Sequence, residues 1–123
     1  MEPLTKAEFE LMEAVWQTSI PITSNRIKEN LANGKAWKAT TILTLLGKLI
    51  DKNYIQAQKQ GKFYEYTILI SKEEYLRQET QGFLQKLYQG SLKNMLATLY
   101  REDSLTETEI AEMKDWFDQE VLK

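Results

Sequence analysis

The chain has 123 residues, enough for one good hydrophobic core or two small ones. It has neither cysteine nor histidine, which excludes disulfides, thiolate or imidazole metal sites, cysteine nucleophiles and histidine acid–base catalysis. We therefore expect neither a cofactor nor enzymatic activity. The chain also has no apolar run of membrane-spanning length and no charged-then-apolar leader, so we expect a cytoplasmic protein without membrane insertion.

The net charge of −2 is unevenly distributed along the chain. Residues 26–62 carry a net charge of +6, whereas residues 71–123 carry −4. A local basic patch attracts phosphate whatever the charge of the whole molecule. The basic middle of the chain therefore indicates a nucleic-acid contact in that part.

The N-terminal segment predicts a helix over residues 5–18. Thr5 followed by Glu8 is a capping box, and a broad apolar stripe comes after it. Pro21 cannot continue a helix and favours extended backbone at the residue before it. We therefore expect a short strand at residues 19–22.

A second, short helix is predicted up to about Leu31. Thr23 or Ser24 can cap it, and Ile27 lies one turn before Leu31 on its buried side. The Asn-Gly pair at residues 33–34 is expected to end it, because glycine is favoured just past a helix end.

The third predicted helix, residues 37–53, has two contrasting faces. Its buried stripe consists of Ile42, Leu45, Leu46, Leu49 and Ile50. Its opposite face consists of Thr40, Thr41, Thr44, Gly47, Lys48 and Asp51. Three threonines are a poor choice for a face that must only be soluble and helical, since β-branched residues have low helix propensity.

This polar face fits a helix that lies in a DNA groove. Hydroxyls bond base edges or phosphates, a threonine methyl can contact a thymine methyl, and glycine permits close approach. Lys38, Lys48 and Lys52 supply positive charge. A solvated face with a chance run of threonines is the alternative at this point.

Residues 54–59 and 63–70 are rich in aromatic and β-branched side chains, and Gln60-Gly61 lies between them as a turn. This predicts a β-hairpin with Lys59 and Lys62 at its tip. Helix, strand, helix, helix and hairpin is the order of a winged helix-turn-helix domain, whose third helix enters the major groove. The predicted DNA-binding residues are Lys38, Thr40, Thr41, Thr44, Lys48, Lys59 and Lys62.

The remaining residues predict helices with much apolar surface. Capping boxes at Ser71 and Thr106 predict the starts of two helices, and Gly90 interrupts the apolar helical pattern between them. The stripe includes Leu84, Leu87, Tyr88, Leu92, Met95, Leu96, Leu99, Ile110, Met113 and Phe117. These helices could fold back on the N-terminal core or pair with a second copy; we favour a homodimer, because so short a segment rarely buries such stripes alone.

The predicted fold is therefore mostly α with a small β-hairpin wing. Residues 1–70 are expected to form a winged-helix DNA-binding domain, and residues 71–123 a helical dimerisation domain. A winged helix used only for protein interaction, with the helical tail as its docking surface, is the alternative function.

Four segments resemble the penicillinase-repressor (BlaI/MecI) family. They are AEFELMEAVW at 7–16, WKATTILTLLGKL at 37–49, KFYEY at 62–66 and EDSLT at 102–106. The resemblance implies a homodimeric transcriptional repressor that binds a palindromic operator in double-stranded DNA. It also implies release when a membrane-spanning sensor triggers proteolytic cleavage in the C-terminal region.

The third helix departs from the family pattern at three positions. Members usually have proline, lysine and arginine where this chain has Ala39, Thr40 and Leu43, so a different operator is expected. Thr41 and Thr44 match the family and are the best base-reading candidates.

The C-terminal region departs as well. Cleavage in the best-known members of the family falls at an asparagine–phenylalanine bond, and the aligned bond here joins Ala97 to Thr98. Related copper-responsive repressors have a C-terminal cysteine pair; this chain has no cysteine, which excludes copper sensing of that kind.

Overall fold

The computed structural model describes residues 1–32 and 36–122 of the chain. These residues are mostly helical with one two-stranded antiparallel sheet, so the predicted fold class is confirmed. They divide into two compact units, Met1–Arg77 and Gln78–Lys123. No helix within the described ranges is long and apolar enough to cross a membrane.

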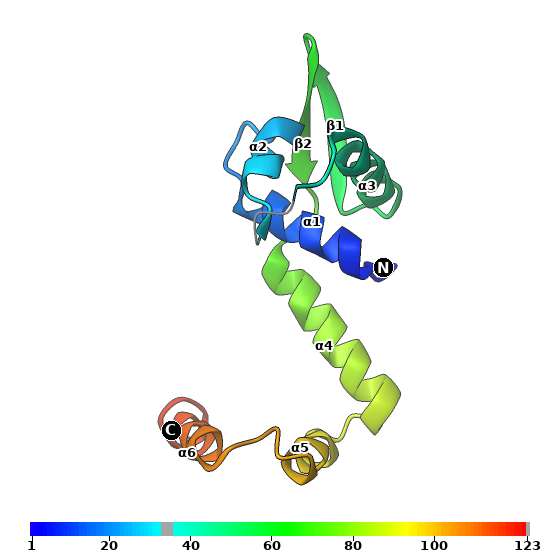
Figure 1. The fold of residues 1–123 in the computed structure, drawn as a ribbon. Coiled ribbons are helices and arrows are strands. Elements are labelled where there is room, and N and C mark those ends of the chain that lie inside the picture. Colours follow the sequence, from blue (N-terminus) through cyan, green and yellow to red (C-terminus); the bar gives the residue numbers. More distant parts are fainter. Residues whose placement is uncertain (33–35, 123) are drawn as a thin grey trace. The chain divides into compact units, whose positions relative to one another are not determined.

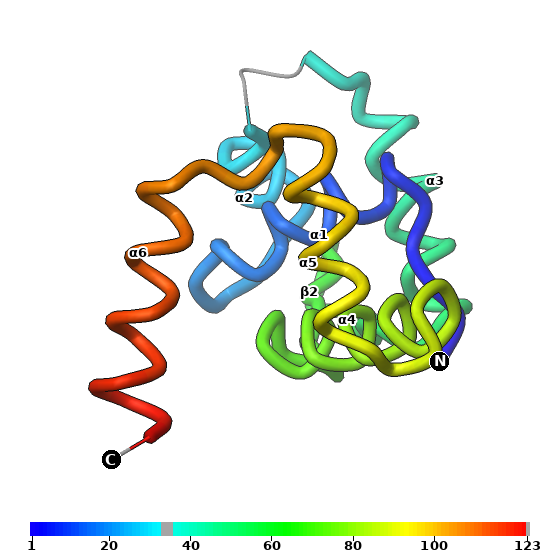
Figure 2. Tube along the Cα trace, turned by 90° about the horizontal axis from the view of Figure 1, so that it is seen from below, coloured from blue at the N-terminus to red at the C-terminus, as the bar shows by residue number. Residues whose placement is uncertain are grey.

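The described residues of the first unit include three α-helices and a hairpin, followed by the start of a fourth α-helix (Figure 1). In chain order these are α1 (Lys6–Gln17), α2 (Ser24–Glu29), α3 (Ala39–Asp51), β1 (Ile55–Gln60), β2 (Phe63–Ile68) and α4 (Lys72–Tyr88). α1 packs against both α2 and α3, which lie on either side of it in both views (Figures 1 and 2). Apart from the strand expected between α1 and α2, this is the order of elements expected of a winged helix.

The helix starts follow the predicted capping residues. The Thr5 hydroxyl accepts the Glu8 N–H (3.2 Å) and the Glu8 carboxylate accepts the Thr5 N–H (2.9 Å), so the capping box of α1 is confirmed. At α2 the cap is Thr23, whose hydroxyl accepts the Arg26 N–H (3.4 Å). α2 ends at Glu29, earlier than predicted; residues 33–34, expected to end it, lie outside the described residues.

Residues 19–22 form no strand, although all of them are described, and this prediction was wrong. Ile22 is buried and its carbonyl oxygen accepts the Tyr66 N–H (2.8 Å), but Ile20 is exposed. A single contact with the sheet is too little to form a ladder. The extended segment therefore meets β2 at one point and is otherwise a bend.

The hydrophobic core lies in the first unit. Its buried apolar residues are Leu11, Met12, Ala14, Val15, Ile22, Ile27, Leu31, Ile42, Leu45, Leu46, Leu49, Tyr54, Ile55, Tyr66, Ile70 and Tyr75. The predicted stripe of α3 is therefore buried, apart from Ile50, which is half-buried. The burial of this stripe fixes which face of α3 points outward.

The hairpin turns one residue later than predicted. Gln60 pairs with Phe63, so the two turn residues are Gly61 and Lys62 rather than Gln60 and Gly61. Gly61 has φ +62°, which a type II′ turn requires at its first central position and which glycine adopts without strain. Lys62 consequently lies in the turn itself, whereas Lys59 lies within β1.

The first turn of α4 belongs to the first unit. Tyr75 is buried, and its ring lies 5.7 Å from each of the rings of Phe9, Trp16 and Tyr54. The Lys72 ammonium lies 3.0 Å from a Glu13 carboxylate oxygen of α1. The first unit therefore extends to Arg77, beyond the residue 70 expected from the sequence.

The second unit contains the rest of α4, then α5 (Leu92–Arg101), α6 (Glu107–Trp116) and a π-helical turn, η2 (Phe117–Val121). The predicted interruption is confirmed, with Gln89 at φ +48° and Gly90 at φ +84° between α4 and α5. The predicted capping box of Thr106 and Glu109 opens α6. In this unit no described residue is fully buried.

Candidate nucleic-acid interface

The outward face of α3 carries the predicted polar residues. Thr40, Thr41, Thr44 and Lys48 are all exposed, because the burial of Ile42 and its stripe turns them to solvent. Lys38 is the N-cap of α3, and its side chain makes no capping hydrogen bond. The N–H groups of the first turn therefore lack a side-chain cap at the end of the helix that favours anions.

One threonine of this face makes a hydrogen bond within the helix through its hydroxyl. The Thr44 hydroxyl donates to the Thr40 carbonyl oxygen (2.9 Å). Its hydrogen is used there, so Thr44 offers a neighbouring molecule its methyl group and its oxygen lone pairs. Sequence periodicity places Thr44 on the right face but does not show this bond.

The wing presents the two predicted lysines. Lys62 lies exposed in the turn, and Lys59 lies exposed opposite Tyr64 in the register of the hairpin. The neighbouring rings of Phe63 and Tyr64 are 64% and 52% exposed, and neither residue was among the predicted DNA-binding residues. The tip of the hairpin therefore combines positive charge with apolar rings.

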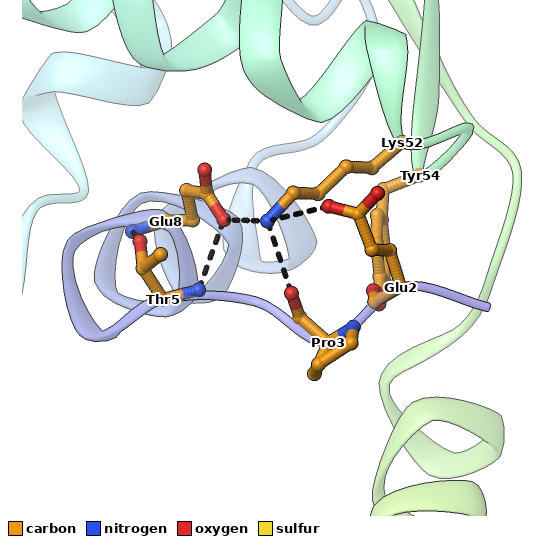
Figure 3. A network of polar contacts seen from close by, with 6 residues as sticks. All are labelled: Glu2, Pro3, Thr5, Glu8, Lys52 and Tyr54. Atoms are coloured by element: carbon orange, nitrogen blue, oxygen red, sulfur yellow. Dashed lines mark hydrogen bonds and ion pairs between the residues drawn. The ribbon is translucent and has the colours of Figure 1, made fainter.

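Lys52 does not belong to this surface, which corrects the prediction that it supplies charge to the DNA-facing helix. Its ammonium lies 2.6 Å from Glu8 Oε1, 3.0 Å from the Pro3 carbonyl oxygen and 3.5 Å from Glu2 Oε2 (Figure 3). Only 15% of its side chain is exposed. Lys52 instead ties the C-terminal end of α3 to the segment before α1.

Glu8 is the acceptor at the centre of this network. Burial acts to raise the pKa of its carboxyl, but hydrogen bonds from Lys52 and Thr5 outweigh burial and lower that pKa. The hydrogen bond to Glu8 raises the pKa of Lys52 in turn. The Tyr54 hydroxyl donates to the Glu2 carbonyl oxygen beside them (Figure 3).

The exposed face of α3 also carries an apolar residue outside the predicted DNA-binding set. Leu43 is 52% exposed. Beside it on the helix, Thr40, Thr41 and Thr44 line an open depression together with Trp37, Ala7 and Leu45. The surface is therefore partly apolar, with lysines at its margins.

The predicted dimerisation residues lie largely at the surface of the second unit. Leu87, Leu92, Leu99, Ile110 and Phe117 are exposed, and Leu84, Tyr88, Met95, Leu96 and Met113 are half-buried. The predicted cleavage region lies inside α5, where the Thr98 hydroxyl donates to the Asn94 carbonyl oxygen (3.1 Å). The Ala97–Thr98 bond is thus helical.

The chain is similar to known repressors over nearly its whole length. The sequence model of the penicillinase repressor family matches residues 4–119. The chain is 31% identical to the penicillinase repressor of Bacillus licheniformis, over 89% of this chain and 85% of that one. It is 26% identical to the methicillin resistance regulatory protein MecI of Staphylococcus aureus (strain N315), over 91% of this chain and 90% of that one.

A solved structure matches the first part of the chain. It is the solution structure of the DNA binding domain of the repressor BlaI, with 29% sequence identity and a TM-score of 0.50. The match covers 61% of this chain and 94% of that one.

Proposed function

The chain belongs to the penicillinase repressor family of DNA-binding transcriptional repressors, and we propose that it binds a two-fold symmetric operator in double-stranded DNA as a homodimer. The observation that carries this proposal is the outward face of α3, with three exposed threonines between exposed lysines. The exposed lysines of the wing lie in the same compact unit. This combination suits a helix in the major groove and a wing on the DNA backbone.

In this proposal the lysines position the protein and α3 recognises sequence. Lys38, Lys48, Lys59 and Lys62 bind phosphates, which gives affinity for any duplex. Thr40, Thr41 and Thr44 contact base edges, which gives preference for the operator.

The exposed apolar side chains of the second unit support the proposed homodimer. Its helices leave large apolar side chains exposed, among them Leu87, Leu92 and Leu99, and burying them against a second copy removes apolar surface from water. Two linked winged domains then bind two half-sites, and the second half-site is bound at high effective concentration.

Release by proteolysis is the third part of the proposal. Cleavage near Ala97–Thr98, triggered indirectly by a membrane sensor-protease, would separate the DNA-binding units in the cytoplasm without removing any DNA contact. Because this bond lies within α5, the helix must unwind locally before a protease can cut it.

The test compares single substitutions on operator and on random duplex DNA. Lys62→Ala should weaken binding to the operator and to random DNA alike. The negative slope of log K against log salt should become less steep by about 0.9 for each protomer bound, because one phosphate contact is lost. Lys59→Ala should do the same. Thr44→Ala should cost about 1–3 kcal/mol on the operator and little on random DNA.

Lys114→Ala in α6 is the matched control and should leave both affinities unchanged. Equal losses on both DNAs for Thr44→Ala would remove its assigned role. If the wild-type protein fails to bind duplex DNA even at low salt, the chain is a protein-interaction module instead.

A further inference from the structure

We propose that Leu43, with the methyl groups of Thr40 and Thr44, recognises thymine 5-methyl groups in the major groove. The chain then selects A·T base pairs mainly by apolar contact rather than by paired hydrogen bonds. This inference rests on the proposed function, since it specifies what the α3 face binds.

α3 lacks the side chains that best identify guanine or adenine by paired hydrogen bonds. Ala39–Asp51 is described throughout and contains no arginine, asparagine or glutamine. Those residues make the bidentate hydrogen bonds that identify guanine or adenine. Lys48 is exposed and its ammonium can donate to a guanine edge, but it is a rotatable point charge without the rigid planar fork of arginine, so it fixes base identity less strictly.

The outward face of α3 is partly apolar. Leu43 is 52% exposed, so it contributes little to the core of its own unit. It lies three residues after Thr40 and four before Gly47, positions that share one side of a helix. A Cβ built on Gly47 meets no atom within 4 Å, so the space beside Leu43 is open to a bound molecule.

The Thr44 hydroxyl is already hydrogen-bonded within α3. Because it donates to the Thr40 carbonyl oxygen (2.9 Å), Thr44 has no hydroxyl hydrogen left for a base acceptor. Its methyl group is the remaining group that can distinguish thymine from other bases. Exposed Lys38 and Lys48 at the margins of this patch favour a polyanion over an apolar protein surface as its occupant.

The experiment removes the methyl groups from the DNA. A duplex that the full-length protein selects from a random library is synthesised with thymine throughout. Matched duplexes carry deoxyuridine in place of a single thymine, either in one half-site or at the equivalent position of both half-sites. Wild-type protein should bind the duplex about fourfold more weakly for each contacted methyl removed, and about 16-fold when both half-sites lose one. Base pairing is the same in both duplexes, so only the methyl contact changes.

The variants identify the residue responsible. At the thymine whose methyl group Leu43 contacts, Leu43→Ala should bind the thymine and deoxyuridine duplexes nearly equally, while the exposed leucine variant Leu69→Ala should keep the wild-type ratio. Leu43→Arg should shift the preferred base toward guanine at the position identified by deoxyuridine, because arginine bonds the guanine edge in pairs. Thermal unfolding of each variant checks that the unit stays folded.

The outcomes separate this inference from the proposed function. If the wild-type protein selects an operator but binds its deoxyuridine form equally well, thymine recognition is wrong and the repressor function stands. If Leu43→Ala keeps the full ratio, the role of Leu43 is wrong. If the protein selects no duplex at all, both proposals fall together.

Discussion

The two units of this chain bury their apolar side chains to very different degrees. All the buried apolar residues of the core lie between Leu11 and Tyr75, in the first unit. In the second unit the amphipathic pattern of α5 is stronger than that of α3 in the first unit, yet Leu92, Leu99 and Tyr100 remain exposed. Periodicity therefore predicts a helix and its apolar face but does not say what covers that face.

Size explains why the second unit differs. A segment as short as Gln78–Lys123 can bury only a small fraction of its surface, and units of this size usually need a metal, disulfides or a partner. The chain contains no cysteine or histidine, which removes disulfides and the usual ligands of a structural zinc site. Association with a second copy is the remaining route in our proposal.

The largest effect is expected from cutting the second unit. A specific protease site inserted between Ala97 and Thr98 should, after cleavage, lower operator affinity by about 10²- to 10⁴-fold, because the two DNA-binding units lose their link. Binding titrations and sedimentation on the same sample measure affinity and mass together. The uncleaved variant is the control, and a cleaved protein that stays dimeric with full affinity would contradict the release mechanism.

The next effect concerns the boundary between the units. Tyr75→Ala should destabilise the first unit by about 3–5 kcal/mol, because it removes a buried ring that packs on Phe9, Trp16 and Tyr54. Urea unfolding measures the loss. The matched control is Leu76→Ala, which removes an exposed side chain from the next position of the same helix and should cost far less.

A Tyr75→Ala protein as stable as the control would show that the first unit ends before α4. A fragment of residues 1–77 should, for the same reason, be more stable than one of residues 1–70.

Local signals in the sequence predicted much of the fold. The capping boxes of Thr5 with Glu8 and of Thr106 with Glu109 depend on residues three positions apart, and both are present. The α3 stripe and the break at Gly90 are similarly local. Such features need no knowledge of distant contacts.

Features that depend on distant contacts were missed. Lys52 is paired with a residue 44 positions away, so its spacing on α3 suggested a DNA contact that the structure does not allow. The anchoring of Tyr75 on α1 likewise could not be inferred from α4 alone. At residues 19–22 proline favours extended backbone, but a strand also needs a neighbour, and only Ile22 meets one.

The Glu8–Lys52 pair offers a test with a defined pH dependence. Glu8→Gln should lower the urea midpoint at pH 7, since glutamine can keep the bond to the Thr5 N–H but loses the charged bond to Lys52. The folded pKa of Glu8 is below its ordinary value of 4.5, so its stabilisation is present above 4.5 and is lost as pH falls through the folded pKa. The difference between wild type and variant should shrink over that acid range.

Two controls sharpen this result. Glu29→Gln, which removes the charge of an exposed carboxylate in α2, is the control for the loss of one negative charge by itself. Lys52→Gln should leave the salt slope of DNA binding unchanged, whereas a slope lowered as much as by Lys62→Ala would return Lys52 to the DNA interface.

The smallest expected change separates stability from function within the first unit. Gly47 lies in the middle of α3, where alanine should stabilise the helix by about 0.5–1 kcal/mol, and the added Cβ meets no atom within 4 Å. The same methyl group would project where we propose that DNA approaches most closely, so Gly47→Ala should raise the urea midpoint and weaken operator binding. Gly82→Ala, also in a helix with an unobstructed Cβ but in the second unit, should leave DNA contacts untouched. A Gly47→Ala protein that is more stable but binds the operator more weakly cannot owe its weaker binding to a folding defect. A Gly47→Ala protein that binds the operator as tightly as wild type would mean that this side of α3 does not lie against the bases.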